Sequence, residues 1–287
     1  MTLDPAASRA VRDIPKLLRA HDLKPRKGLG QNFLVDPAIL QRIVSAAELS
    51  EDDVVVDIGA GVGTLTRLLA GQASRVLAVE LDDNLATILR AEMAGLPNVQ
   101  IIHGDILRLS DLDLGHLGYK VVANLPYYIT SAVLRHFLGR APRPRLMVLT
   151  IQREVAERIV AAPGQMSLLA VSVQLYGRPR IVCRVGAGSF YPPPSVESAV
   201  VRIEVREQPA VALAEGLDED LFFRVARAGF AQKRKTLRNA LSAGLHLSPP
   251  HVEEELARAG VDPRRRAQTL SLPEWAEVVA RLAGDLD

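Results

Sequence analysis

Apolar and polar positions change period along the chain in a regular way. Short apolar runs at Val54–Asp57, Val76–Glu80 and Val99–His103 are separated by stretches with helical spacing, and two more runs follow at Lys120–Ala123 and Leu146–Ile151. Such alternation is typical of buried parallel strands joined by helices. It predicts an α/β fold on an open, mostly parallel, doubly wound sheet, which binds ligands at the carboxyl ends of its strands.

Other segments extend this pattern. The apolar spacing predicts a basic helix within residues 1–27, and Asp36 before Pro37 is typical of an N-cap and first turn, so we expect a helix from there through Ala47. Residues 167–176 satisfy both the helical and the strand period. Arg180–Arg184 and Ser198–Val205 are expected to form a closing hairpin at the sheet edge.

The strand pattern relaxes around Glu207–Gly216, and the rest of the chain has helical spacing only. The helices expected there are Glu219–Ala231, Lys235–Ala243, Pro250–Ala259 and Pro273–Ala283. We therefore expect two domains, a catalytic sheet domain with a basic N-terminal arm at 1–208 and a small all-helical domain at 209–287.

Composition narrows the class of protein. The 287 residues contain no apolar run of membrane-spanning length and no signal segment at the start, so a cytoplasmic protein without a membrane partner is expected. Cys183 is the single cysteine in the sequence, which excludes an internal disulfide framework and a cysteine-based zinc cluster. We interpret it as a small buried residue.

Charge is informative through its distribution, because the formal net charge is only +2. Basic residues cluster in three places: Arg9, Arg12, Lys16, Arg19, Lys24, Arg26 and Lys27; Lys233, Arg234, Lys235 and Arg238; and Arg264, Arg265 and Arg266. A cluster of this kind is usually a solvated face. Three of them flanking a candidate site favour a polyanionic partner.

The first strand ends in a glycine-rich turn, Asp57-Ile58-Gly59-Ala60-Gly61-Val62-Gly63, that leads into a helical run. Gly59 and Gly61 let the backbone bend sharply and a ligand approach closely, and amides at the helix start favour a negative group. Glu80, at the end of the next strand, can accept both hydroxyls of a ribose. A simple packing turn is the alternative, and the third glycine of the dinucleotide pattern is replaced by Thr64. Together with Glu80, the turn favours nucleoside binding.

Three further motifs carry candidate chemistry. Asp105, after the third strand, can accept a hydrogen bond from an adenine amine, although an acid in a turn is common. In Asn124-Leu125-Pro126-Tyr127, the Asn124 side-chain oxygen and the Leu125 carbonyl can accept an amine's hydrogens while Tyr127 stacks on the ring; a structural turn is the alternative. Prolines 192–194 stiffen a loop that either presents Phe190 as a second stacking ring or is a plain linker.

Residues 28–37, Gly-Leu-Gly-Gln-Asn-Phe-Leu-Val-Asp-Pro, have no periodicity. Their amides, glycines and single aromatic suit either a loop that covers a ligand or an ordinary turn before a helix.

Taken together, these motifs resemble the ribosomal RNA adenine dimethyltransferases. The resemblance is carried by Leu29–Leu34, Asp57–Gly63, Glu80, Gly104-Asp105, Asn124–Tyr127 and Phe190–Pro194, and it runs from about Ile14 to Leu282. Phe230–Leu241 and Arg266–Ser271 are similar to the bacterial small-subunit branch of that family. Gln268 departs from the pattern, because an acid is expected there.

The resemblance implies a Rossmann-like class I methyltransferase fold, S-adenosyl-L-methionine as the methyl donor, and no metal. It implies dimethylation of two adjacent adenines near the 3′ end of 16S rRNA, in the small subunit or its precursor, by a monomer with a role in small-subunit biogenesis. The implied donor-binding residues are Asn32, Leu34, Gly59, Gly61, Glu80, Asp105, Ile106 and Asn124. The implied residues around the target base are Asn124, Leu125, Pro126, Tyr127 and Phe190, and those for RNA are Lys233, Arg234, Lys235 and Arg238.

Three other functions share some of these sequence features. The sister group that methylates one adenine of 23S rRNA and confers macrolide resistance is the nearest, but Leu125 and the basic helical tail favour the small-subunit branch. A non-catalytic RNA-binding assembly factor is disfavoured by the complete Asn124–Tyr127 and Gly59–Gly63 motifs. A nicotinamide dehydrogenase is disfavoured by the glycine spacing and by the lack of an evident proton-transfer residue.

Overall fold

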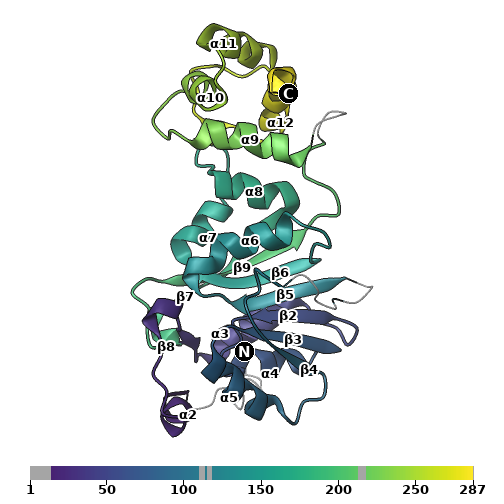
Figure 1. Cartoon of the computed structure of the whole chain (residues 1–287), viewed down its shortest axis with the longest axis vertical. Coiled ribbons are helices and arrows are strands. Elements are labelled where there is room, and N and C mark those ends of the chain that lie inside the picture. Colours follow the sequence, from purple (N-terminus) through teal and green to yellow (C-terminus); the bar gives the residue numbers. More distant parts are fainter. Residues whose placement is uncertain (1–13, 110–113, 115–117, 213–217, 287) are drawn as a thin grey trace. The chain divides into compact units, whose positions relative to one another are not determined.

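The structure, a computed structural model, describes residues 14–109, 114, 118–212 and 218–286, and it divides into two compact units (Figure 1). The sheet unit comprises Met1–Ala156 and Arg178–Val205, and the helical unit comprises Glu157–Gly177 and Arg206–Asp287. The division expected from sequence placed residues 157–177 in the sheet domain, whereas they belong to the helical unit. Tyr176 joins this segment to α9 of the helical unit: its hydroxyl is bonded to Glu219, and its ring lies 6.2 Å from that of Phe223.

The sheet has seven strands in the order β4-β3-β2-β5-β6-β9-β7. Their bounds are β2 Val54–Ile58, β3 Arg75–Glu80, β4 Val99–His103, β5 Tyr119–Asn124, β6 Leu146–Gln152, β7 Gly177–Val185 and β9 Ser198–Val205. Strands β2 to β6 pair in parallel, and β9 is antiparallel to β6. The predicted doubly wound sheet is confirmed. Strand order reverses between β2 and β5, where such sheets bind their ligands.

The last two strands of the sheet are neighbours, as the predicted hairpin requires, but they are not consecutive in sequence. Between them lies β8, Phe190–Tyr191, which pairs instead with β1, Phe33–Leu34. Phe33 is opposite Tyr191, and Leu34 is opposite Phe190. A two-residue strand has no detectable period, so the sequence pattern did not predict this pair.

The helices of the sheet unit cover both faces of the sheet. They are α2 Ile14–Ala20, α3 Pro37–Ala47, α4 Thr64–Ala70, α5 Asp83–Met93 and α6 Thr130–Leu138; α7, Arg153–Ile159, crosses the boundary between the units. Leu40 of α3 and Leu65 of α4 pack in one core with Val55, Val122 and other inward-facing valines. On the opposite face, the ring of Tyr119 lies 6.2 Å from that of Phe137 in α6.

Local signals placed several of these helices correctly. The Asp36 side chain accepts bonds from the N–H groups of Ala38 and Ile39, so the predicted cap and the helix through Ala47 are confirmed. The basic helix expected within 1–27 is only partly correct, because α2 ends at Ala20 and a 3₁₀ turn, η1, occupies Lys27–Leu29. Residues 1–13, with Arg9 and Arg12, lie outside the described residues. Helix α6 was not predicted.

The helical unit contains α8 Leu168–Tyr176, α9 Glu219–Phe230, α10 Leu237–Leu245, α11 Pro249–Arg258 and α12 Leu272–Leu282. Trp275 is fully buried at its centre, 5.4 Å from the ring of Phe230, and a Cβ on Gly229 would lie only 2.5 Å from the indole. The segment of ambiguous period is helical, because Ser167 caps it at the Ala170 N–H. Within the described ranges, no helix has the length and apolar content needed to cross a bilayer.

Candidate functional site

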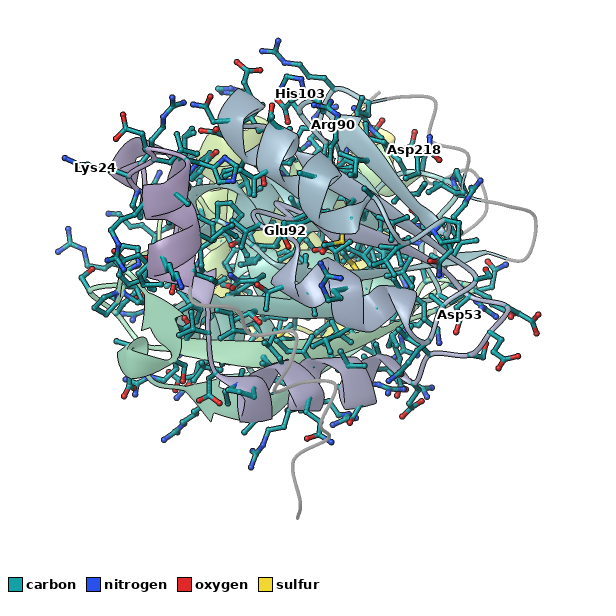
Figure 2. All side chains as sticks on the ribbon, turned by 90° about the horizontal axis from the view of Figure 1, so that it is seen from below. Lys24, Asp53, Arg90, Glu92, His103 and Asp218 are labelled. Carbon is teal, nitrogen blue, oxygen red and sulfur yellow. The ribbon has the colours of Figure 1, made fainter. Side chains whose placement is uncertain are left out.

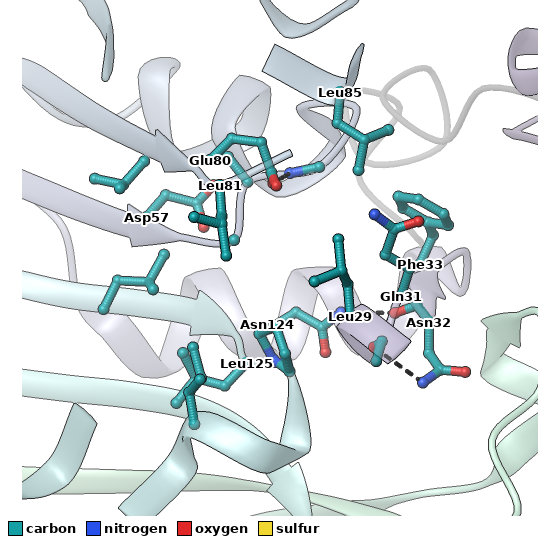
Figure 3. Close-up of a pocket in the computed structure, with 18 of the residues that line it drawn as sticks. Leu29, Gln31, Asn32, Phe33, Asp57, Glu80, Leu81, Leu85, Asn124 and Leu125 are labelled. Atoms are coloured by element: carbon teal, nitrogen blue, oxygen red, sulfur yellow. Dashed lines mark hydrogen bonds between the residues drawn. The ribbon is translucent and has the colours of Figure 1, made fainter. Parts of the chain in front are cut away.

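A cavity of about 400 Å³ lies at the carboxyl ends of β2, β3 and β5 (Figure 3). Its walls include residues 29–34 of the N-terminal arm, the glycine turn, the ends of the strands with the segments that follow them, and Phe190 of β8. Every residue predicted from sequence to bind the donor or the target base lines it: Asn32, Leu34, Gly59, Gly61, Glu80, Asp105, Ile106, Asn124, Leu125, Pro126, Tyr127 and Phe190.

The glycine turn has a backbone that side chains would block. Gly59 and Gly61 have φ of +69° and +61°, in the left-handed region. A Cβ on Gly59 would lie 3.2 Å from Pro126, and one on Gly61 would lie 3.1 Å from the ring of Phe33. The turn therefore packs against both the arm and the Asn124–Tyr127 motif.

Glu80 is bound into this turn. Its Oε2 accepts the Gly61 N–H at 2.8 Å, and its Oε1 accepts the Asp82 N–H at 2.9 Å. Burial raises the pKa of Glu80, and the backbone donors of Asp82 and Gly61 oppose that rise. A carboxylate offers about four acceptor positions, so each oxygen keeps capacity for a ligand hydroxyl.

Asp57 is a second acid in the cavity wall; the sequence predicted it at the start of the glycine motif but assigned it no role in the site. It is 1% exposed, and its Oδ2 accepts the Thr66 hydroxyl at 2.7 Å. Burial raises the pKa of Asp57 to about 7, the bond from Thr66 opposes the rise, and the charge on Glu80 adds to it. An acid at the end of an apolar run, two residues before the first glycine of the turn, was the available sequence signal.

Within the arm, residues 14–36, residues 29–34 line the cavity, so the ligand-covering alternative for residues 28–37 is favoured. Asp82 holds the arm in place: its Oδ2 lies 2.9 Å from the Arg26 guanidinium and 3.3 Å from Gln31 Nε2. Gln31 Oε1 accepts the Arg26 N–H at 2.7 Å. Asp82 is more than 50 residues from both of its partners in the arm, so no local sequence pattern indicates these contacts.

Asn124 is oriented by the arm. Its Nδ2 donates to the Asn32 carbonyl at 3.0 Å, which fixes the amide so that Oδ1 is left as an acceptor. Leu125 donates its N–H to the Thr150 carbonyl at 3.2 Å. Among the residues that the structure describes, neither Asn124 Oδ1 nor the Leu125 carbonyl accepts a hydrogen bond. Both come from the end of β5 (Figure 3), so the cavity contains two adjacent free acceptors.

Two aromatic rings line the same cavity as these acceptors. The hydroxyls of Tyr127 and the buried Ser198 share a hydrogen bond of 2.6 Å, which anchors the Tyr127 ring from β9. Phe190 is 4% exposed and packs in the core beside Leu34, its partner across the β1–β8 pair. Burial raises the pKa of Tyr127, so its phenol stays neutral at physiological pH.

The sequence matches a known family over most of its length. The family model described as ribosomal RNA adenine dimethylase covers residues 22–284. The chain belongs to this family. The enzyme class expected from the motifs is therefore confirmed: the protein is an rRNA adenine dimethyltransferase that uses S-adenosylmethionine, and the dehydrogenase alternative is wrong.

Individual named proteins are closely similar to this chain. The ribosomal RNA small subunit methyltransferase A of Dehalococcoides mccartyi strain CBDB1 is 48% identical over 272 residues, covering 94% of this chain and 92% of the relative. The protein of the same name from Moorella thermoacetica is 45% identical over 275 residues, covering 91% and 94%.

Solved structures give the same fold. A dimethyladenosine transferase from Plasmodium falciparum has a TM-score of 0.74 at 25% identity, covering 88% of this chain and 98% of that one. The 23S rRNA methyltransferase ErmE has a TM-score of 0.68 at 28% identity, covering 88% and 100%. The predicted Rossmann-like fold with a helical C-terminal region is confirmed.

The residues present fit the donor of an adenine dimethylase. Gly59 and Gly61 line the cavity without side chains of their own, Glu80 keeps acceptor capacity, and Asp105 lines the same cavity. Asp105 Oδ1 accepts the Leu107 N–H at 3.0 Å, and the Arg108 guanidinium lies 3.5 Å from Oδ2. In the described part of the chain, no group of three or more His, Cys, Asp or Glu could hold a metal.

The basic residues that follow α9, three before α10 and Arg238 within it, differ in their contacts. Lys233, Arg234 and Lys235 are exposed and have no ion pair within the described ranges, whereas Arg238 is paired with Glu253 at 2.6 Å. The helix expected from Lys235 begins two residues later, at Leu237, so Lys235 precedes α10. On the sheet unit, Lys24 projects outward from the arm (Figure 2).

Proposed function

We propose that this enzyme dimethylates the exocyclic amines of two adjacent adenosines near the 3′ end of 16S rRNA, within the small ribosomal subunit or its precursor. It would act in the cytoplasm as a monomer and take part in small-subunit biogenesis. The choice of the small subunit is supported by relatives of that name at up to 48% identity. The observation that carries the site assignment is the Asn124 amide, which the Asn32 carbonyl turns so that Oδ1 and the Leu125 carbonyl are both free to accept.

The donor half of the cavity would be formed by the glycine turn and the ends of β3 and β4. Gly59 and Gly61 would lie along the methionine and ribose part of the donor, and Glu80 would accept the ribose hydroxyls. Asp105 and Ile106 would contact the donor's adenine, and Asn32 and Leu34 would cover it from the arm. When bound, S-adenosylmethionine supplies a methyl group that its sulfonium charge already activates.

The protein's main task is to prepare the acceptor, because the amine of adenine is conjugated with its ring and is a poor nucleophile. Hydrogen bonds from that amine to Asn124 Oδ1 and the Leu125 carbonyl would favour a pyramidal nitrogen with an available lone pair. Tyr127, anchored by Ser198, and Phe190 would hold the ring by stacking. Positioning of this kind lowers a barrier by up to ~7–11 kcal/mol in favourable cases.

RNA would also contact the helical unit. Lys233, Arg234 and Lys235 are exposed cations without ion pairs among the described residues, which suits contact with phosphates. The predicted role of Arg238 is less direct, because its guanidinium is already engaged by Glu253.

Incubation with labelled donor tests this function. Small subunits and large subunits from strains that lack the modification would be treated separately, and the labelled nucleotides mapped by mass spectrometry. We expect N6,N6-dimethyladenosine at two neighbouring positions near the 3′ end of 16S rRNA. Label on 23S rRNA would favour the macrolide-resistance type, and no label on either subunit would favour the non-catalytic assembly factor.

A further inference from the structure

Tyr128 is an exposed aromatic residue at the cavity wall. It is 57% exposed, and in the described chain only Leu81 and Val196 are other large hydrophobic side chains with comparable exposure. Tyr128 and Leu81 line the cavity, and Val196 does not; Tyr128 is the aromatic one of the three. A large apolar ring left in water beside a binding cavity indicates a contact surface for a ligand or partner.

The backbone separates Tyr128 from its neighbour Tyr127. Both lie in the 3₁₀ turn η2, Tyr127–Ile129, and successive side chains in such a turn project about 120° apart. Tyr127 is anchored to the buried Ser198, so Tyr128 projects in a different direction and remains exposed. The two rings therefore serve different positions.

The ring of Tyr128 is supported by the arm. A Cβ on Gly30 would lie 3.5 Å from Tyr128 Cδ1 and 3.6 Å from Pro126 Cβ, so the ring lies close against the Gly30 backbone. Gly30 has φ of +61°, which a residue with a side chain would adopt only with strain. One edge of the ring therefore lies against the arm, and the rest of the ring is exposed.

The surroundings of Tyr128 shift the pKa of its phenol further above its ordinary value near 10. Burial raises the pKa of Tyr128, and the negative charges of Asp105 and Glu80 raise it further. A neutral phenol ring stacks on a base without the repulsion that a phenolate would suffer near phosphates.

We infer that Tyr128 stacks on the nucleobase adjacent to the target adenine, outside the cavity. This inference depends on the proposed function: when one of two consecutive adenines lies between Tyr127 and Phe190, its neighbour must leave the cavity within one nucleotide. Tyr128 is the exposed aromatic residue of the cavity wall, and base–aromatic stacking is sequence-tolerant, so the same ring serves whichever adenine is outside. Its loss should lower kcat/KM for RNA by about 5- to 150-fold, the range for one stacked base.

A cycle that combines protein and RNA changes tests this assignment. Small subunits would be reconstituted with 16S rRNA ligated to synthetic 3′ fragments in which either of the two adenosines is an abasic ribose. Methylation of the remaining adenosine would be measured for the wild type, Tyr128→Ala and Tyr128→Phe. Val196→Ala is the matched control, because it removes an exposed hydrophobic side chain that does not line the cavity. Donor affinity would be measured by calorimetry for each protein.

We expect Tyr128→Ala and an abasic neighbour each to lower kcat/KM by a similar factor. In at least one of the two abasic RNAs, Tyr128→Ala should lower kcat/KM little further. Tyr128→Phe should behave as the wild type, and donor affinity should be unchanged. The assignment would be overturned if the effects of Tyr128→Ala and of the abasic site multiplied fully in both RNAs. A weakened donor affinity in Tyr128→Ala would also overturn it, because Tyr128 would then be a contact of the donor. If the wild type fails to methylate intact subunits, the proposed function itself is wrong.

Discussion

The orientation of Asn124 gives the sharpest prediction about the chemistry. Its Nδ2 is held by the Asn32 carbonyl at 3.0 Å, so Asn124→Asp would place an acceptor against an acceptor, and Asn124→Ala would remove both groups. A partly buried carbonyl left without its donor costs about 1–3 kcal/mol. An acceptor amine displaced by about 1 Å loses about 10²-fold in rate. We therefore expect kcat to fall by about 10²- to 10³-fold in both variants, equivalent to about 3–4 kcal/mol.

The assay is single-turnover methyl transfer to small subunits at saturating donor, with donor affinity measured by calorimetry. The glycine turn, Glu80 and Asp105 are untouched, so donor affinity should stay within about tenfold, or about 1.4 kcal/mol. Asn98→Ala is the matched control: Asn98 Nδ2 donates to the Ala70 and Ala73 carbonyls at 2.8 and 3.0 Å, and Asn98 does not line the cavity. It should lose stability but keep its kcat. A kcat for Asn124→Ala equal to that of the wild type would refute the reasoning.

Three further changes probe separate parts of the molecule. The pKa of Asp57 is about 7 in the folded protein and 3.8 for an unburied aspartate, so the folded wild type loses stability as the pH rises from the lower value to the higher. Asp57→Asn lacks this loss, and the melting temperature of the donor-free variant, relative to that of the wild type, should therefore rise between pH 5 and 8. Changing Lys233, Arg234 and Lys235 to Gln should reduce the slope of log K against log salt for RNA by about 0.7 per lost phosphate contact. Phe190→Leu, which keeps apolar volume in the core, should raise KM for RNA or lower kcat, with donor affinity unchanged in calorimetry.

Each of these has an outcome that would contradict it. A melting difference that is constant across pH would show that Asp57 ionises without a penalty on folding. Arg238→Gln is the comparison for the basic cluster, because its guanidinium is engaged by Glu253; a larger loss of salt dependence there than for Lys233 would exclude the cluster from the RNA contact. Weakened donor binding in Phe190→Leu would place that ring in the donor half of the cavity.

Local sequence signals predicted the parts of the site that depend on a few consecutive residues. The glycine turn, Glu80 and the Asn124–Tyr127 motif each follow an apolar run, and the carboxyl ends of parallel strands meet at one edge of a sheet. Their convergence on one cavity therefore follows from the strand pattern. The cap at Asp36 is likewise local, because the two N–H groups that donate to its carboxylate lie within three residues of it.

The contacts that tune the site were not predictable in the same way. Asn124 and Asn32 are 92 residues apart, and Tyr127 and Ser198 are 71 apart. Such pairs depend on the tertiary fold, and an asparagine or a serine has the same appearance in the sequence whether or not it finds a partner. The return of residues 157–177 to the helical unit depends on Tyr176 meeting Glu219 in the same way.

The most direct test of the account is a crystal structure of the enzyme with a non-reactive donor analogue and a short RNA that contains the target adenosine. We predict that the amine lies about 2.7–3.2 Å from both Asn124 Oδ1 and the Leu125 carbonyl, with its ring between Tyr127 and Phe190. An adenine bound elsewhere, or an amine turned away from these two acceptors, would contradict the account.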